Sequence, residues 1–161
     1  MKKAEHYGIP AAMAVCVAVL LVFLFAIQRS GKVSGAAVKT VSAAVTAVTD
    51  QSQMKQGNNS MVKRLYGLDP NEYEGVSLYY PSSAAAANEV LVVKLKDVKQ
   101  QEGVKAAVEA RRDSQTKNFN GYGVGQYEML KASVLDVSGN YVLYVVSKNP
   151  KEADAAFQKA L

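Results

Sequence analysis

The sequence is poor in the residues that most often carry chemistry, with one cysteine, one histidine and no tryptophan. Cys16 lies within a long apolar run, and His6 lies in the short segment before it. With a single thiol, no disulfide can form within the chain. The residues after the apolar run cannot supply a zinc site built from His and Cys, nor Cys–His or Ser–His–Asp catalysis. We therefore assign no catalytic residue, no metal ligand and no cofactor.

An excess of charge of one sign is also missing from most of the chain. The 161 residues include 19 Lys and Arg and 14 Asp and Glu, for a net charge of +5. Four of these bases and one acid precede position 33, which leaves 15 bases and 13 acids, a net of +2, in the remainder. Binding to nucleic acid requires a concentrated basic face. Nucleic acid is therefore not among the expected partners.

The sequence does contain one long hydrophobic run. Ile9 to Ile27 are 19 residues without a charge, and 11 of them are Leu, Ile, Val or Phe. As a helix the run would reach about 28 Å, close to the roughly 30 Å of bilayer hydrocarbon. We expect a tail at 1–8, a transmembrane anchor at 9–28, a linker at 29–35 and a soluble domain at 36–161. The expected contact of the anchor is the lipid bilayer, through Ile9 to Ile27.

Other interpretations of this run are less favoured. A core helix is disfavoured because little chain follows that could surround it. A cleaved signal usually has a shorter apolar region, although Ser34-Gly35-Ala36 would permit cleavage. A lipoprotein signal is rejected because Val15, which is not small, precedes Cys16. The basic residues on the two sides of the run are nearly equal in number, so the positive-inside rule does not decide orientation. A short tail before a first apolar helix favours an uncleaved single-pass signal anchor with the domain on the outer side.

The pattern after the run predicts a small α+β domain. We expect a four-stranded, mainly antiparallel sheet with helices packed on one face. Apolar spacing, turns and caps predict the elements, in the order helix, helix, strand, strand, helix, strand, strand, helix. They are a helix through Val38, Val41, Val45 and Val48; a short helix from Met61 to Tyr66 ended by Gly67; strands Val76–Tyr80 and Val90–Lys96, the second half-exposed; a helix Val98–Phe119 closed by Asn120-Gly121; a hairpin of Ser133–Val137 and Tyr141–Ser147; and a helix with Asn149 as N-cap and Pro150 first.

The long helix carries the candidate ligand-binding residues. Arg111 and Gln115 fall in the middle of its apolar face, and Tyr122 follows the end of the helix. A guanidinium beside an amide could bind a carboxylate or a phosphate, because arginine presents a planar fork of donors. The more ordinary use of such an arginine is packing, with its stem covering apolar surface at the sheet edge. The sequence leaves both interpretations open.

Two further patterns are given structural interpretations. The segment that begins at Asp69 partly resembles a calcium-binding loop. Glu74 stands at the sixth position, where such a loop requires glycine, and Tyr80 stands at the twelfth, where it requires a bidentate glutamate. Gly121, Gly123 and Gly125 follow a helix and precede no Lys-Ser/Thr pair, so we interpret them as a connector and not a phosphate loop.

Short motifs along the chain resemble one bacterial envelope family, catalogued as domain of unknown function 4358. They are Leu65-Tyr66-Gly67-Leu68-Asp69, the strand ending at Tyr80, Ala87 to Lys94, Val104 to Tyr122 and Gly139 to Leu143. The resemblance covers roughly 33–161. It implies an extracytoplasmic domain behind an anchor or a lipoprotein signal, and it supplies no catalytic residue.

The function expected from the sequence is a membrane-anchored, extracytoplasmic, non-catalytic binding domain. Its expected partner is an envelope protein, a peptide or a wall component. One alternative is a small membrane-anchored hydrolase or transferase without a metal, and another is a regulatory domain that faces the cytoplasm. The sequence alone does not decide among these.

Overall fold

The structure is a computed structural model that describes residues 16–17, 19–20 and 33–161. Contacts divide the chain into two units, 1–31 and 32–161, and each is considered by itself. In the first unit, Cys16, Val17, Val19 and Leu20 are helical and exposed. Among the described residues, no helix combines the length and apolarity needed to cross a bilayer. Most of the predicted span Ile9 to Ile27 lies outside these residues.

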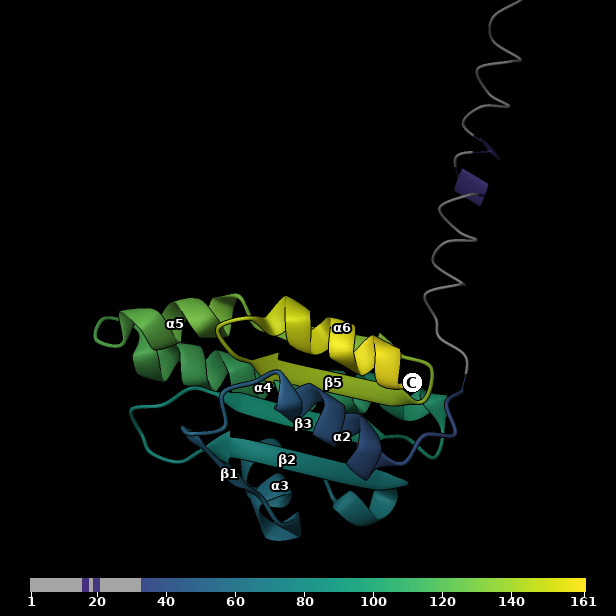
Figure 1. Cartoon of the computed structure of the whole chain (residues 1–161), viewed down its shortest axis with the longest axis horizontal. Helices are drawn as coiled ribbons and strands as arrows, with labels where there is room; N and C mark the ends of the chain where they lie inside the picture. Colours follow the sequence, from purple (N-terminus) through teal and green to yellow (C-terminus); the bar gives the residue numbers. More distant parts are fainter. Residues whose placement is uncertain (1–15, 18, 21–32) are drawn as a thin grey trace, which may run out of the picture. The chain divides into compact units, whose positions relative to one another are not determined.

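The second unit contains five α-helices and five strands (Figure 1). Four of the helices were expected at about these places, but α5 and β1 were not expected at all. The elements are α2 Val38–Ala47, β1 Met54–Gln56, α3 Asn59–Tyr66, β2 Gly75–Pro81, β3 Glu89–Lys94, α4 Gln101–Phe119, α5 Val124–Lys131, β4 Val134–Ser138, β5 Tyr141–Val146 and α6 Pro150–Ala160, with 3₁₀ turns at Pro70–Glu72 and Val98–Gln100.

All strands form one antiparallel sheet in the order β1-β2-β3-β5-β4. The predicted mainly antiparallel arrangement is therefore confirmed, but the number of strands is five and not four. The extra strand, β1, has only three residues and carries no apolar alternation, so periodicity could not reveal it.

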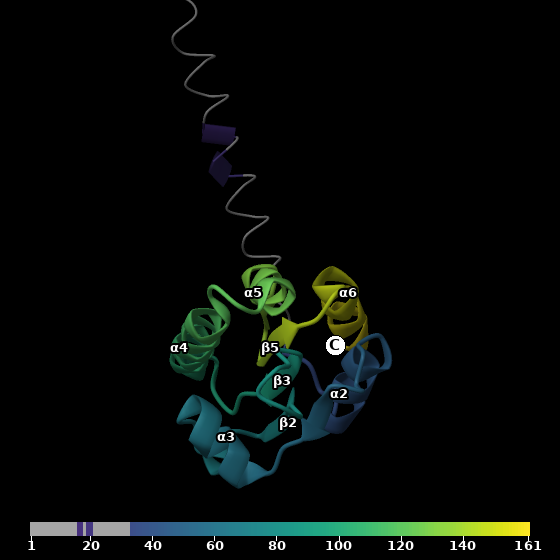
Figure 2. The same ribbon diagram turned by 90° about the vertical axis from the view of Figure 1, so that its left-hand side faces the viewer.

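Helices cover both faces of the sheet, which corrects the expectation of one covered face. Helices α2 and α6 lie on one side and α3, α4 and α5 on the other (Figure 2). Successive strand side chains point to opposite faces, so Val90 and Val92 pack toward α2 and α6 while Leu91 and Val93 pack toward α3 and α4. Every residue of β3 and β5 is buried for this reason.

The strand expected to be half-exposed is thus central. Lys94, which lies in this strand, is 6% exposed, and its Nζ lies 2.7 Å from Oε1 of Glu74. Its ammonium also lies over the Tyr141 ring, 5.7 Å from the centroid. An ion pair and an aromatic face compensate for the burial of the charge.

Local signals placed several ends correctly. The Asn58 side chain accepts a hydrogen bond from the Met61 amide at 3.0 Å and so caps α3. Gly67 ends that helix with φ of 69°, a left-handed conformation that glycine adopts without steric cost. Pro150 begins α6 as predicted, but the Asn149 side chain makes no capping hydrogen bond.

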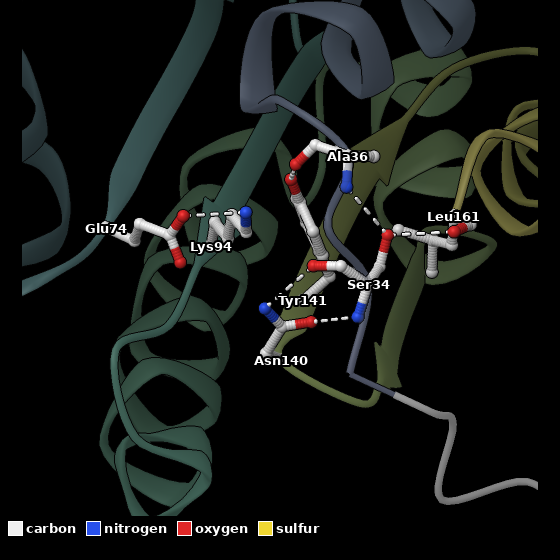
Figure 3. A network of polar contacts seen from close by, with 7 residues as sticks. All are labelled: Ser34, Ala36, Glu74, Lys94, Asn140, Tyr141 and Leu161. Carbon is white, nitrogen blue, oxygen red and sulfur yellow. Dashed lines mark hydrogen bonds and ion pairs between the residues drawn. The ribbon is translucent and has the colours of Figure 1, made fainter.

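The segment before α2 is fastened to the domain (Figure 3). The Ser34 amide donates to Oδ1 of Asn140 at 2.8 Å, and Nδ2 of Asn140 donates to the Ser34 carbonyl at 3.2 Å. The Ser34 hydroxyl donates to the Leu161 carbonyl at 2.8 Å, and the Tyr141 hydroxyl donates to the Ala36 carbonyl at 2.5 Å. The hydrogen bonds of the domain therefore include residues from Ser34 onward.

Candidate functional site

A buried carboxylate lies at the centre of the candidate site. Glu89 is the first residue of β3, and its side chain points to the face that α3 and α4 cover. The residue is 1% exposed. A carboxylate at this depth requires hydrogen bonds or a counter-charge, because burial removes its water. Helices α3 and α4 provide both.

The Tyr66 hydroxyl, at the end of α3, donates a hydrogen bond to Oε1 of Glu89 at 2.7 Å. Burial, and next the negative charge of Glu89, raise the pKa of Tyr66 well above its usual value. Tyr66 therefore stays protonated and acts as a donor. It holds one carboxylate oxygen in place from the side of α3.

Arg111, near the middle of α4, pairs with the same carboxylate. Its Nε lies 3.2 Å from each Glu89 oxygen, and Nη2 donates to Oε2 at 2.9 Å. Burial disfavours the charge of Arg111, but the Glu89 carboxylate raises the pKa of the guanidinium above its ordinary value. Burial also raises the pKa of Glu89, and Arg111 and Tyr66 oppose that rise.

Gln115, one turn further along α4, extends the pair. With its amide oxygen turned toward the guanidinium, it accepts from Nη1 of Arg111 at 2.7 Å and from Nη2 at 2.6 Å. The structure thus brings Arg111 and Gln115 together on one helix face. Arginine has five N–H donors, so these contacts leave one Nη1 N–H without an acceptor among the described residues.

Tyr122 does not join them. It lies in the turn between α4 and α5, it is 72% exposed, and its ring contacts Phe119 with centroids 5.9 Å apart. The structure does not bring Tyr122 to Arg111 and Gln115, and the reason is geometric. Phe119, the last residue of α4, is eight residues beyond Arg111, and a helix rises about 1.5 Å per residue, so the turn lies roughly 12 Å away.

A hollow of about 230 Å³ opens beside Arg111 and Gln115. Among the described residues that line it, Arg64 of α3 and Arg111 of α4 carry charge, and none is an acid or a histidine. The full lining consists of Arg64, Leu65, Tyr80, Pro81, Ser83, Ala84, Ala86, Arg111 and Gln115. Because the Glu89 carboxylate neutralises the charge of Arg111, the exposed Arg64 gives the hollow a net positive charge. The hollow therefore presents donors and positive charge to an incoming group, which suits a carboxylate or a phosphate.

Sequence reasoning missed Glu89, Tyr66 and Arg64. A signal existed for Glu89, because it is an acid at the start of the apolar run Val90 to Val93. Within the described ranges, no three His, Cys, Asp or Glu side chains are arranged to hold a metal ion.

Comparison with known protein families gives a match. The family model described as Domain of unknown function (DUF4358) matches residues 47–147, which include every residue that lines the hollow, as well as Tyr66 and Glu89. Neither the curated proteins nor the solved structures contain a match. The match spans more than half of the chain, so this protein belongs to the family described as Domain of unknown function (DUF4358).

Proposed function

We propose that this protein is a membrane-tethered binding module whose domain lies on the outer side of the cell membrane. In this proposal the hollow beside Arg111 recognises a carboxylate or phosphate of an envelope protein, a peptide or a wall component. One observation carries it. Arg111 is held by Glu89 and Gln115, and it faces a cavity that Arg64 makes positive and that has no acid among its described lining residues.

Pre-organisation is the physical basis of binding here. A free arginine side chain loses rotamer freedom when it binds a ligand, whereas Arg111 has already lost that freedom in the folded protein. Its remaining N–H and the Arg64 guanidinium can then bind an oxyanion at a smaller entropic cost. The cavity is small, which suits one acidic group of a larger partner better than a whole cofactor.

The geometry favours binding over hydrolysis or group transfer. Tyr80 and Ser83 bring hydroxyls to the hollow, but none of its nine lining residues is a carboxylate, a histidine or a lysine that could act as a general base. The Glu89 carboxylate, which pairs with Arg111, accepts hydrogen bonds from both Tyr66 and Arg111. The lone pairs of Glu89 are therefore occupied by these hydrogen bonds.

The tether rests on the apolar run Ile9 to Ile27, which contains no charge. A charge-free run of this length is more stable in hydrocarbon than in water. In this proposal the outer location rests on the resemblance of the chain to a family of bacterial envelope proteins.

Protease accessibility tests the location. We expect protease added to intact bacterial cells that express the full chain to digest residues 33–161, while a cytoplasmic control protein survives. Digestion only after lysis would instead support a domain that faces the cytoplasm. Full-length, untrimmed chain in the soluble fraction without detergent would contradict the tether.

Titration tests the hollow. Inorganic phosphate and N-acetylglutamate are added separately to the full chain in detergent micelles, and NMR follows the Gln115 side-chain amide and Nε of Arg111. We expect saturable shifts that Arg64→Ala weakens at least about fivefold and that Arg112→Ala, which removes the same charge outside the hollow, leaves within about twofold. No saturable shift with either probe, or equal effects of the two variants, would contradict the site.

A further inference from the structure

Half of strand β2 has no neighbouring strand on its outer side. Strand β1 pairs only with Tyr79 to Pro81, and the Gly57 amide then donates to the Leu78 carbonyl at 2.8 Å. Beyond Gly57 the chain leaves the sheet and enters α3 at Asn59. The first half of β2, from Gly75 to Ser77, is therefore an open edge.

The direction of the backbone groups follows from antiparallel geometry. In such a ladder the N–H and C=O of one residue point to the same side, and the side alternates along the strand. The Leu78 carbonyl points outward to Gly57, so the N–H and C=O of Val76 point outward as well. Within residues 33–161 no strand lies opposite them. Val76 thus offers one donor and one acceptor to an added strand.

A groove runs beside this open edge. It has a volume of about 550 Å³ and lies between α2 and β2. Helix α2 covers the sheet face opposite the one that α3 and α4 cover (Figure 2), so the groove and the arginine-lined hollow lie on different faces. At its floor the Ser42 and Ser77 hydroxyls are 2.7 Å apart, and Tyr79 forms part of the lining. Lys39 and Ala43, both exposed, line the groove from the side of α2.

The other edge of the sheet, formed by β4, carries a charged residue. Strand β4 carries Asp136 at its centre, where the carboxylate accepts a hydrogen bond from the Gln158 amide. A charge in the middle of an edge strand discourages pairing with another chain. The open part of β2, Gly75-Val76-Ser77, carries no charge. The sheet is protected at one edge and accessible at the other.

We propose that the groove between α2 and β2 binds an extended peptide segment of a partner protein, which pairs with β2 at Val76 and continues the sheet in line with β1. Strand addition supplies affinity through main-chain hydrogen bonds, and the groove accommodates alternate side chains. The three open residues of β2 span about 10 Å, so the paired part of the peptide is short. Among the described residues that line the groove, Lys39 alone is charged, and it favours an acidic side chain or a terminal carboxylate on the peptide.

This site is separate from the hollow and does not require the tether. Arg64 and Arg111 lie on the α3–α4 face, whereas the groove lies on the α2 face. Arg64→Ala is therefore expected to leave peptide binding in the groove unchanged. A result that contradicts ligand binding in the hollow therefore does not contradict peptide binding in the groove, and the reverse also holds.

Selection of peptides tests the proposal. The full chain in detergent micelles is used to select binders from a random-peptide phage library, and the dissociation constants of the synthetic peptides are then measured. Ala43→Trp fills the groove, and Ala47→Trp places the same side chain on an exposed position of α2 outside the groove. We expect Ala43→Trp to weaken binding at least about tenfold and Ala47→Trp to change it less than about twofold.

A second variant and a second measurement examine the strand pairing itself. Val76→Pro removes the outward N–H, and proline is tolerated where a strand edge faces solvent. We expect it to weaken the selected peptides, and we expect bound peptide to slow hydrogen exchange of the Val76 amide in the wild-type chain. The proposal is overturned if no peptide is selected, if Ala43→Trp has no effect, or if Val76 exchange is unchanged. A concentration-dependent dimer that Ala43→Trp abolishes would also overturn it, in favour of a second copy of the chain.

Discussion

The Arg111 guanidinium meets the Glu89 carboxylate along one edge, with Nε 3.2 Å from each oxygen and Nη2 2.9 Å from Oε2. The Arg111 side chain is 12% exposed and that of Glu89 1%, and the pair joins the middle of α4 to the start of β3. This pair lies beneath the hollow and determines how Arg111 is presented. A buried pair adds little stability over an apolar replacement, but removal of one partner leaves the other charge uncompensated.

Breaking the pair is therefore expected to be costly. We predict that Glu89→Ala lowers the free energy of unfolding by about 3–5 kcal/mol and that Arg111→Ala does so by a similar amount. The double variant should lose less than the two single losses added together, because neither charge then remains. Urea denaturation measures all three. As a control, Lys105→Ala breaks the exposed ion pair with Glu102 and should cost less than about 1 kcal/mol. A loss at Glu89 no larger than this control would contradict the prediction.

The Tyr66 hydroxyl contributes separately. Tyr66→Phe removes its hydrogen bond to the carboxylate and is predicted to cost about 1.5–3 kcal/mol, the range for hydrogen bonds to charged groups. Tyr73→Phe is the matched control, because Tyr73 is buried but its hydroxyl makes no hydrogen bond within residues 33–161. Urea midpoints compare the two variants. Equal effects would show that the hydroxyl of Tyr66 adds nothing beyond packing.

Two glycines should respond in opposite directions to the same substitution. Gly67 has φ of 69° and open space around it, so Gly67→Ala meets only backbone strain and is predicted to cost about 1–2 kcal/mol. Gly103 lies within α4, also with open space, and Gly103→Ala is predicted to add about 0.5–1 kcal/mol of stability. Thermal unfolding of both variants measures the difference. If both variants change the stability in the same direction, either the left-handed backbone of Gly67 or the helical backbone of Gly103 is contradicted.

Alkaline pH should release the contact between Tyr141 and Ala36. Burial, and next the charge of Glu74, raise the pKa of Tyr141 from 10.0 to about 12. The folded state thus holds the phenolic proton more tightly than the unfolded state does. The resulting stability is present below pH 10 and is lost as the pH rises from about 10 through about 12. Urea midpoints measured across this window should fall more steeply for the wild type than for Tyr141→Phe. Parallel curves would contradict the shift.

Asn140 is predicted to hold the entry segment of the domain. Asn140→Ala removes two hydrogen bonds to the Ser34 backbone, and the buried amide of Ser34 then lacks its acceptor. We expect a loss of about 1–3 kcal/mol and faster hydrogen exchange at the Ser34 amide. Asn120→Ala is the control, because Asn120 is exposed and its side chain makes no hydrogen bond in the described part of the chain. Unchanged exchange at Ser34 would mean that other contacts fasten this segment.

The elements that the sequence predicted well are those with local causes. Val38, Val41 and Val45 repeat at helical spacing, and the last two are buried residues of α2. Asn58 and Gly67 mark the two ends of α3 through contacts within a few residues. The hairpin of β4 and β5 turns at Gly139, which has φ of 57°. Each of these depends on neighbours along the chain, so reading the chain was sufficient.

The predictions that failed concern layers and distant neighbours. The second helical layer on the sheet makes β3 central and buries Lys94, and no local pattern reports how many helices a sheet will carry. Strand β1 and helix α5 lack a strong apolar period and depend on β2 and α4 for their place. Tyr122 was assigned to the site by sequence proximity, whereas the length of α4 separates it from Arg111.

Residue types and short spacings were enough to predict the family, the α+β class, both ends of α3 and the position of Arg111 and Gln115 on one helix face. Contacts between distant parts of the folded chain decide that Glu89 holds Arg111 and accepts a hydrogen bond from Tyr66, that Arg64 makes the hollow positive, and that the first half of β2 is left unpaired. Those relationships join residues about 20 or more positions apart. They arise when burial forces a charge to find partners and when the chain departs from the sheet at Gly57.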